Sequence, residues 1–247
     1  SDDMKNFLSI DQGTTSSRSI IFDANLNLVT DAQEEYDLTY PEDGWVELEP
    51  KKIIETVTNT LNKVVSADIG LEACGITNQR ETTIVWSKST GEAIYPGIVW
   101  QDRRTHEYCS YLKSNGHEPV IKEKTGLLLD PYFSATKIKW ILDNVDGARE
   151  KASKGELLFG TVDSYLIYML SQEKNHFTDV TNASRTLLFN IKSMEWDDEL
   201  LELFEIPKTM MPEVLSCDGD FGNLKINDCE IPIRGVIGDQ QAALVGQ

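Results

Sequence analysis

The sequence predicts an α/β fold in which helices flank a mixed β-sheet. The first part of the chain is typical of a meander of short strands, and later strands alternate with helices. No internal repeat, low-complexity segment or linker rich in glycine, serine and proline interrupts the 247 residues. We therefore expect one compact domain that spans residues 1–247 and is long enough to bury a substantial core.

Apolar runs and turn residues predict the N-terminal elements. Residues 7–10 and 20–22 are apolar strands, and Asp-Ala-Asn at residues 23–25 is the expected tight turn to a third strand that ends near Tyr36. Pro50 begins a helix, because apolar residues recur at helical spacing until about residue 70. Further strands are expected at residues 73–76, 83–86 and 98–100.

Helices dominate the middle of the chain, and one late strand follows them. The helices are expected at residues 103–113, 136–145, 162–170 and 197–204. The strand, residues 231–237, ends in Gly238 and Asp239, and another helix begins near residue 242. Ligands of open α/β sheets gather at the carboxyl ends of strands, so we expect Asp239 to meet Asp11, which follows the first strand. The alternative is that Asp239 only caps its helix.

The polar stretch Asp-Gln-Gly-Thr-Thr-Ser-Ser-Arg, residues 11–18, is predicted to be a phosphate-binding loop between two strands. Its glycine lets backbone amides approach an anion, and its hydroxyl groups can donate to phosphate oxygens. Arg18 supplies a cation, and Asp11 can face the metal ion of a nucleotide. The loop leads into a strand and lacks the lysine of the common strand-to-helix phosphate loop. An ordinary polar hairpin, braced by Arg18, is the alternative.

Composition and charge narrow the classes of function. The formal net charge of −18 opposes binding to nucleic acid or anionic lipid, because both depend on accumulated lysine and arginine. No apolar stretch reaches membrane-spanning length, and the N-terminal residues show no signal or transit pattern, so we expect a cytoplasmic protein. The four cysteines lack zinc-ligand spacing and are predicted to be free thiols.

Three segments make the prediction of function specific: Ile-Thr-Asn-Gln-Arg-Glu-Thr-Thr at 76–83, Asp-Pro-Tyr-Phe-Ser-Ala-Thr-Lys at 130–137 and Gly-Asp-Gln-Gln-Ala-Ala-Leu at 238–244. With residues 11–18, 160–163 and 181–186 they closely resemble the glycerol kinases of the FGGY carbohydrate kinase family. The resemblance implies an actin-like, ribonuclease H-like lobe. It also implies a carboxy-terminal lobe that holds most of the adenosine of ATP and that this chain lacks, so we expect negligible turnover from residues 1–247 alone.

Recognition of a polyol requires paired donors and acceptors and an apolar wall. Arg80 can donate to two adjacent hydroxyl oxygens, and Glu81 can accept their protons. Tyr132 offers a phenolic hydroxyl, and Trp100, expected at the end of its strand, can shield the carbon chain. By resemblance, Arg80, Glu81 and Tyr132 match residues that hold glycerol, and Gln240 matches a further polyol contact. A surface ion pair for Arg80 and Glu81, and core packing for Trp100, are the alternatives.

Phosphoryl transfer to a primary alcohol requires a carboxylate that accepts its proton, and Asp239 is the predicted base. Asp239 also completes the predicted Mg²⁺ site with Asp11, which acts through water. The hydroxyl groups expected to steady the γ-phosphoryl group of ATP, together with Arg18, belong to Thr14, Thr15 and Ser16.

We therefore expect ATP-dependent phosphorylation of glycerol to sn-glycerol 3-phosphate, a step of glycerol uptake and catabolism. A kinase for another small polyol or sugar, and a non-catalytic actin-like nucleotide switch, are the alternatives. Residues 223–228 lack the glycine-rich, basic insertion that binds fructose bisphosphate in some members of the family, which argues against inhibition by that sugar phosphate. The sequence leaves homo-oligomerisation open.

Overall fold

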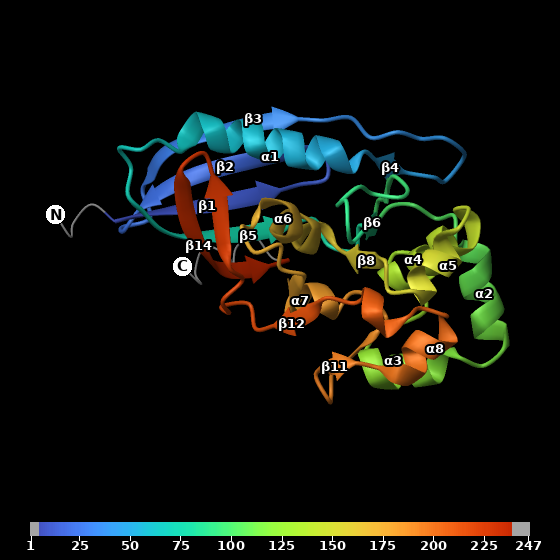
Figure 1. Cartoon of the computed structure of the whole chain (residues 1–247). Helices are drawn as coiled ribbons and strands as arrows, with labels where there is room; N and C mark the ends of the chain where they lie inside the picture. The colour runs from blue at the N-terminus through green and yellow to red at the C-terminus, as the bar shows by residue number, and fades with distance from the viewer. Residues whose placement is uncertain (1–4, 239–247) are drawn as a thin grey trace.

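A six-stranded mixed sheet occupies one half of the computed structural model, which describes residues 5–238. The strand order is β13-β14-β5-β1-β2-β3. β1 (Asn6–Gln12), β5 (Leu71–Asn78) and β14 (Cys229–Ile237) are parallel, whereas β13 (Asn223–Ile226) pairs antiparallel with β14 (Figure 1). The predicted mixed sheet with flanking helices is therefore confirmed.

The N-terminal meander is confirmed and consists of three antiparallel strands. β1 continues through a short turn into β2 (Ser16–Asp23), and β2 continues into β3 (Leu28–Glu35). The carboxylate of Asp23 accepts hydrogen bonds from the backbone amides of Asn25 and Asn27, both at 2.9 Å. These bonds close the second turn, as the residue types at 23–25 predict.

Helix α1 (Pro50–Val64) lies along β2 and β3 (Figure 1). Ile53, Val57 and Leu61 are fully buried on the face that meets the sheet. Two hydroxyl pairs, both at 2.8 Å, also join the helix to β2: Ser17 with Thr56 and Ser19 with Thr60. The helix ends at Val64, earlier than expected, because Val65 adopts an extended conformation.

The other half of the molecule is mainly helical (Figure 1). Its helices are α2 (His106–Ser114), α3 (Glu118–Thr125), α4 (Ser134–Asn144), α5 (Ala148–Ser153), α7 (Val180–Ala183) and α8 (Asp198–Leu203). Helix α6 (Val162–Leu170) packs instead against β5 and β13 of the large sheet. The prediction gave the bounds of α6 and located α2, α4 and α8 within a few residues. It missed α3, α5 and α7, because these helices are short and carry few apolar repeats.

Short two-stranded ladders connect these helices to the sheet. They pair β4 (Glu47–Leu48) with β7 (Gly97–Ile98), β6 (Ile84–Ser87) with β8 (Leu157–Gly160), β9 (Phe177–Asp179) with β12 (Glu213–Leu215), and β10 (Phe189–Asn190) with β11 (Glu195–Trp196). The β6–β8 ladder separates two hydrophobic cores. Ile84 and Trp86 pack into the core under the large sheet, whereas Val85 between them packs into the core around α4.

Two further predictions from composition concern the cysteines and the membrane. All four cysteines are free thiols, as predicted. Among residues 5–238, no helix combines the length and the apolar character that a membrane crossing requires.

Candidate active site at the carboxyl edge of the sheet

The three parallel strands end at one edge of the sheet and bring three predicted segments together. In their register Asp11 of β1 lies beside Thr77 of β5, and Thr77 lies beside Ile237 of β14. The phosphate hairpin follows β1, residues 79–83 follow β5, and Gly238 follows β14. The structure therefore brings these three segments to one edge of the sheet, up to Gly238.

The turn of the phosphate hairpin is shorter than predicted. Asp11 belongs to β1 and Arg18 to β2, where they are directly paired, so only residues 13–15 lie between the strands. The amide of Gly13 donates to the carbonyl of Ser16 at 2.8 Å and closes the turn. Thr14 is half-buried and Thr15 is exposed, so both hydroxyl-bearing residues border the edge where a ligand would bind.

A buried network that the sequence analysis missed fixes this turn. The hydroxyl of Tyr36 donates to the backbone carbonyl of Gly13 at 2.6 Å and accepts from the side-chain nitrogen Nε2 of Gln12 at 2.6 Å. Gln79 donates to the same carbonyl at 2.8 Å, and its backbone amide donates to Gln12 at 2.7 Å. Burial raises the pKa of Tyr36 to about 12, so its hydroxyl keeps the proton that it donates. No local pattern reveals such a network, because its members come from three separate segments.

Arg18 pairs with Asp31 of β3 at 2.8 Å, and both side chains are about one-third exposed. This contact is the bracing alternative left open by the sequence, and phosphate binding by Arg18 stays a prediction. Burial raises the pKa of Asp11, and the charge of Arg18 opposes that rise. Because burial disfavours the ionised form of Asp11, a metal cation bound nearby would stabilise that form.

Glu81 is held in an unusual and specific conformation. Its side chain is only 2% exposed, and its backbone has a φ of 69°, in the left-handed region that few residues other than glycine adopt. Its carboxylate accepts from Nε of Arg185 at 2.7 Å, and Nε of Arg80 lies 3.8 Å away. Burial raises the pKa of Glu81, whereas the hydrogen bond and charge of Arg185 lower it. The alternative of a surface ion pair therefore does not hold for Glu81, because the glutamate is buried and its closer partner is Arg185.

Arg80 lies across the described end of β14. A Cβ atom added to Gly238 would come within 2.4 Å of Cδ of Arg80, so only glycine leaves room for this side chain. The amide of Gly238 donates to the hydroxyl of Thr181 at 2.9 Å, at the start of α7. Asn182, the next residue, exchanges two amide hydrogen bonds with Asn78, at 2.9 and 3.1 Å.

Two aromatic side chains form a wall beside Glu81. The ring centroids of Trp100 and Tyr132 are 5.5 Å apart, and the guanidinium of Arg185 lies over the ring of Tyr132 at 5.6 Å. Trp100 is half-buried and follows β7 by two residues, in a turn, and not at a strand end as expected. Its indole Nε1 donates to the hydroxyl of Thr14 at 3.1 Å. Trp100 also packs against the edge of the core under the large sheet, so the core-packing alternative holds in part, while its indole nitrogen contacts the phosphate hairpin.

Lys137 of α4 is a further residue that the sequence analysis missed. Its side chain is fully buried, and its ammonium donates to the carbonyls of Val99 at 2.9 Å and Trp100 at 3.3 Å. The sequence does carry a signal, since Lys137 precedes the buried Ile141 by four residues and therefore shares its helix face.

Two predicted residues, Asp239 and Gln240, lie outside the residues that the structure describes. The convergence of Asp239 with Asp11 on one cation therefore stays a prediction. Within residues 5–238, no group of three or more histidine, cysteine, aspartate and glutamate side chains could hold a metal ion. A divalent ion at this edge would need oxygen ligands from a nucleotide, water or residues after Gly238.

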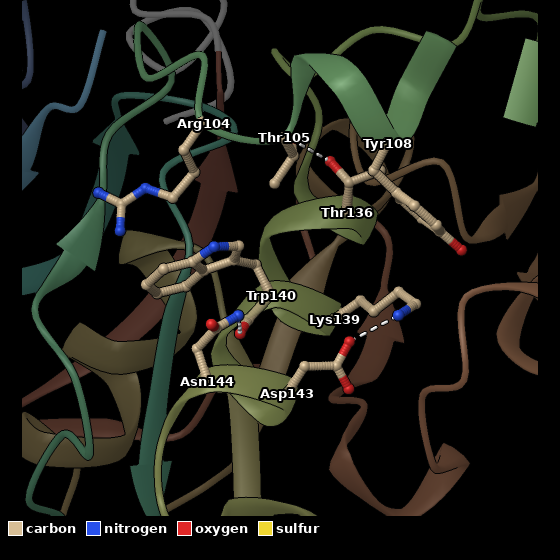
Figure 2. Close-up of a pocket in the computed structure, with 8 residues that line it drawn as sticks. All are labelled: Arg104, Thr105, Tyr108, Thr136, Lys139, Trp140, Asp143 and Asn144. Atoms are coloured by element: carbon tan, nitrogen blue, oxygen red, sulfur yellow. Dashed lines mark hydrogen bonds and ion pairs between the residues drawn. The ribbon is translucent and has the colours of Figure 1, made fainter. Parts of the chain in front are cut away.

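A separate pocket of about 170 Å³ opens between α2 and α4. Figure 2 shows its lining: Thr105 and Thr136 share a hydrogen bond of 2.7 Å, and Lys139 pairs with Asp143 at 2.5 Å. The guanidinium of Arg104 lies over the ring of Trp140 at 4.5 Å. Its polar groups largely satisfy one another, and no predicted site residue lines it.

Comparison with known proteins gives concordant matches. A model of the N-terminal domain of the FGGY family of carbohydrate kinases matches residues 6–246. A glycerol kinase of Alteromonas mediterranea is 57% identical over 98% of this chain and 51% of its own length. A glycerol kinase of Haemophilus influenzae is 53% identical over 99% and 50%, respectively. The chain thus spans about half the length of the curated relatives it matches.

Solved structures share the fold. The crystal structure of Plasmodium falciparum glycerol kinase with ADP matches with a TM-score of 0.92 and 35% identity, over 97% of this chain and 49% of that chain. A xylulose kinase of Rhodospirillum rubrum matches with a TM-score of 0.84 at 18% identity, over 94% and 48%. The second likeness shows the architecture alone.

Proposed function

Since the chain belongs to the FGGY family of carbohydrate kinases, we propose that it is the polyol- and phosphate-binding N-terminal domain of an ATP-dependent glycerol kinase. The proposed reaction transfers the γ-phosphoryl group of ATP to a primary hydroxyl of glycerol and yields sn-glycerol 3-phosphate and ADP. A second, carboxy-terminal domain would hold most of the adenosine, and residues 1–247 would be inactive without it.

The observation that carries this proposal is the hydrogen bond between Trp100 and Thr14, because it joins the candidate polyol wall to the phosphate hairpin. Beside that wall, Glu81 is buried and oriented by Arg185, and Arg80 is close enough to share a ligand with it. A carboxylate that accepts and a guanidinium that donates are the complementary partners of adjacent hydroxyl groups. The apolar rings would cover the carbon chain of a small polyol.

The phosphoryl group would be steadied by the hydroxyl groups of Thr14, Thr15 and Ser16 and by the amides of the hairpin turn. Asp11 fits an outer position of a Mg²⁺ site, because it is a partly buried carboxyl group at the same edge. Magnesium would neutralise charge on the phosphate oxygens during transfer. The positive charge of Arg18 would favour the ionised form of Asp11, and Arg18 would keep its bracing contact with Asp31.

We propose Asp239 as the base that takes the proton of the attacking hydroxyl and Gln240 as a further polyol contact. Asp239 directly follows Gly238, whose amide is bound by Thr181 at the edge that carries the other candidate residues. An Asp239→Asn enzyme of full natural length should lose orders of magnitude in kcat and keep nearly normal glycerol affinity. Near-normal turnover would refute that role.

The substrate is tested by calorimetric titration with glycerol, dihydroxyacetone, erythritol and xylulose. Glycerol should bind most tightly, and Glu81→Gln should weaken its binding by about tenfold or more, because a charged acceptor is lost. Glu195→Gln, at an exposed glutamate of β11, is the matched control. Tighter binding of erythritol or xylulose would favour a kinase for another polyol or sugar.

The nucleotide-switch alternative predicts a different outcome. A switch would hydrolyse ATP without transferring phosphate to any polyol, and Glu81→Gln would leave that hydrolysis unchanged. A coupled ADP-release assay with and without glycerol, on the protein of full natural length, separates the two. The cytoplasm is the proposed location, glycerol and ATP or ADP are the proposed ligands, and nucleic acid is not an expected partner at a net charge of −18.

A further inference from the structure

Lys137 occupies a fully buried position, where the loss of water around a charged side chain destabilises the folded state. It lies on the buried face of α4, and its side chain has no exposed surface. Its ammonium donates to two backbone carbonyls, of Val99 and Trp100. Within residues 5–238 it forms no ion pair, and the carboxylates of Asp102, Glu81 and Asp130 act on it only through space.

An apolar residue of similar volume would fill this space without the desolvation of a charge. Burial lowers the pKa of Lys137 to about 7, and the charges of Asp102 and Glu81 oppose that shift, while Arg104 adds to it. Packing alone therefore does not account for a lysine at this position. Its two hydrogen bonds identify what it holds, namely the backbone of residues 99 and 100.

The same turn is fixed on its other side by a second buried charged group. Asp102 accepts from the backbone amide of Val46 at 2.7 Å and pairs with Arg104 at 2.8 Å. The backbone around Trp100 is thus held at two places. Lys137 binds the carbonyls of Val99 and Trp100, and Asp102, two residues after Trp100, binds the backbone amide of Val46. The indole ring is the part of this turn that reaches Thr14 and Tyr132.

We propose that Lys137 is a positioning residue that fixes the Trp100 ring as the wall of the polyol site and thereby sets the affinity for the polyol. This inference rests on the proposed function for the identity of the ligand. The contact between Lys137 and Trp100 does not depend on that function. A rigid wall contacts the substrate equally before and during phosphoryl transfer, so its loss raises KM and leaves kcat unchanged.

The test uses the protein of full natural length with 5-fluorotryptophan in place of tryptophan. The ¹⁹F resonance of Trp100 is assigned by its absence from Trp100→Phe. Lys137→Met should shift or broaden this resonance and raise the KM for glycerol about tenfold, with kcat within about twofold of the unmodified enzyme. Lys139→Met, two residues along the same helix at a surface ion pair with Asp143, should do neither.

A double-mutant cycle shows whether Lys137 acts through Trp100. In the Trp100→Phe background, Lys137→Met should add less than about twofold to the KM, because the group that it positions is already gone. Lys137→Gln keeps a donor of slightly shorter reach and should give an intermediate KM, and it replaces the methionine variant if that protein does not fold.

An unchanged Trp100 resonance in the Lys137 variants would overturn the proposal, and so would effects on KM that multiply in the double variant. If glycerol does not bind the unmodified protein, the proposed function fails. The resonance then still decides whether Lys137 holds Trp100.

Discussion

Trp100 and Thr14 are joined by a 3.1 Å hydrogen bond across 86 positions of sequence, from the indole Nε1 to the threonine hydroxyl. The bond links a turn held by α4 to the hairpin between β1 and β2. The candidate polyol wall and the candidate phosphate hairpin are therefore one connected unit. A change in the hairpin should therefore alter the position of the wall, and a change in the wall should alter the hairpin.

Tyr36→Phe removes the hydroxyl that holds the carbonyl of Gly13 and accepts from Gln12 and Gln79. The loss leaves the buried side-chain amide nitrogen of Gln12 without the hydroxyl that accepts from it, while Gln79 keeps its bonds to Gln12 and to the Gly13 carbonyl, so the free energy of unfolding should fall by about 1–3 kcal/mol. ADP affinity should fall with it, because the turn loses its anchor. Urea unfolding and calorimetric titration measure the two effects. Tyr40→Phe, at a side chain 68% exposed, should change neither, and equal effects in both variants would contradict the prediction.

Arg185→Gln removes the cation that holds the Glu81 carboxylate. Arg185 lowers the pKa of Glu81 against the rise caused by burial, so its loss raises that pKa further. Glycerol affinity should fall by about tenfold or more, because the carboxylate loses the cation that holds it, and the pH at which affinity is lost on acidification should move upward. The measurement is the dissociation constant of glycerol as a function of pH. Arg234→Gln, at an exposed pair with Asp220, is the control, and a profile parallel to that of the unmodified protein would argue against this role.

Gly238→Ala places a methyl group 2.4 Å from Cδ of Arg80, which is closer than two carbon atoms of different residues can approach. Arg80 must move, and glycerol affinity should fall by roughly tenfold, with little loss of stability because Arg80 is partly exposed. Gly235→Ala, three residues earlier and within β14, is the matched control, since its new methyl group meets nothing closer than 3.8 Å. Calorimetric titration of both variants decides the matter. Equal glycerol affinity in the two would show that Arg80 does not contact the ligand.

Asp163 near the start of α6 supplies a prediction about pH. Burial, followed by the charge of Asp179, raises the pKa of Asp163 to about 7 from an ordinary value of 3.8. Between those two pH values the folded state keeps a proton that the unfolded chain has lost, so this carboxyl group lowers stability as the pH rises through the window.

Asp163→Asn cannot ionise and should escape this loss. Its free energy of unfolding, relative to that of the unmodified protein, should rise by up to about 1.4 kcal/mol per pH unit between about pH 4 and 7 and level off above. Urea unfolding at several pH values measures the difference. Asp146→Asn, at an exposed aspartate, should show a flat difference, and a flat difference for Asp163→Asn would refute the raised pKa.

The sequence predicts the elements whose apolar pattern is long and regular. β1, β2 and α1 follow from such patterns, because each buries one face against the core under the sheet, whereas α6 is apolar along most of its length and is buried on nearly all sides. The length of the phosphate loop could not be predicted, because β2 buries Ser17 and Ser19, whose hydroxyl groups pair with threonines of α1. Buried polar residues of this kind look like loop residues in a sequence.

Residue types in the sequence indicated the candidate ligand-binding residues. They did not indicate the buried residues that hold those side chains in place. Arg80, Glu81, Trp100, Tyr132 and the hairpin lie near one another, which agrees with the shared site that the family resemblance implies. Tyr36, Arg185 and Lys137 act over long sequence separations, and only the fold brings them to their partners. Periodicity reports which face of an element is buried, and it does not report what that face contacts.

The paired amides of Asn78 and Asn182 tie β5 to α7 with two neutral hydrogen bonds between buried side chains. Neutral bonds of this kind are not screened by dissolved ions, whereas the attraction between Arg18 and Asp31 at the surface is. The frame around the candidate site should therefore keep its shape over a wide range of ionic strength. High salt would weaken the capture of a charged ligand without loosening the scaffold that receives it.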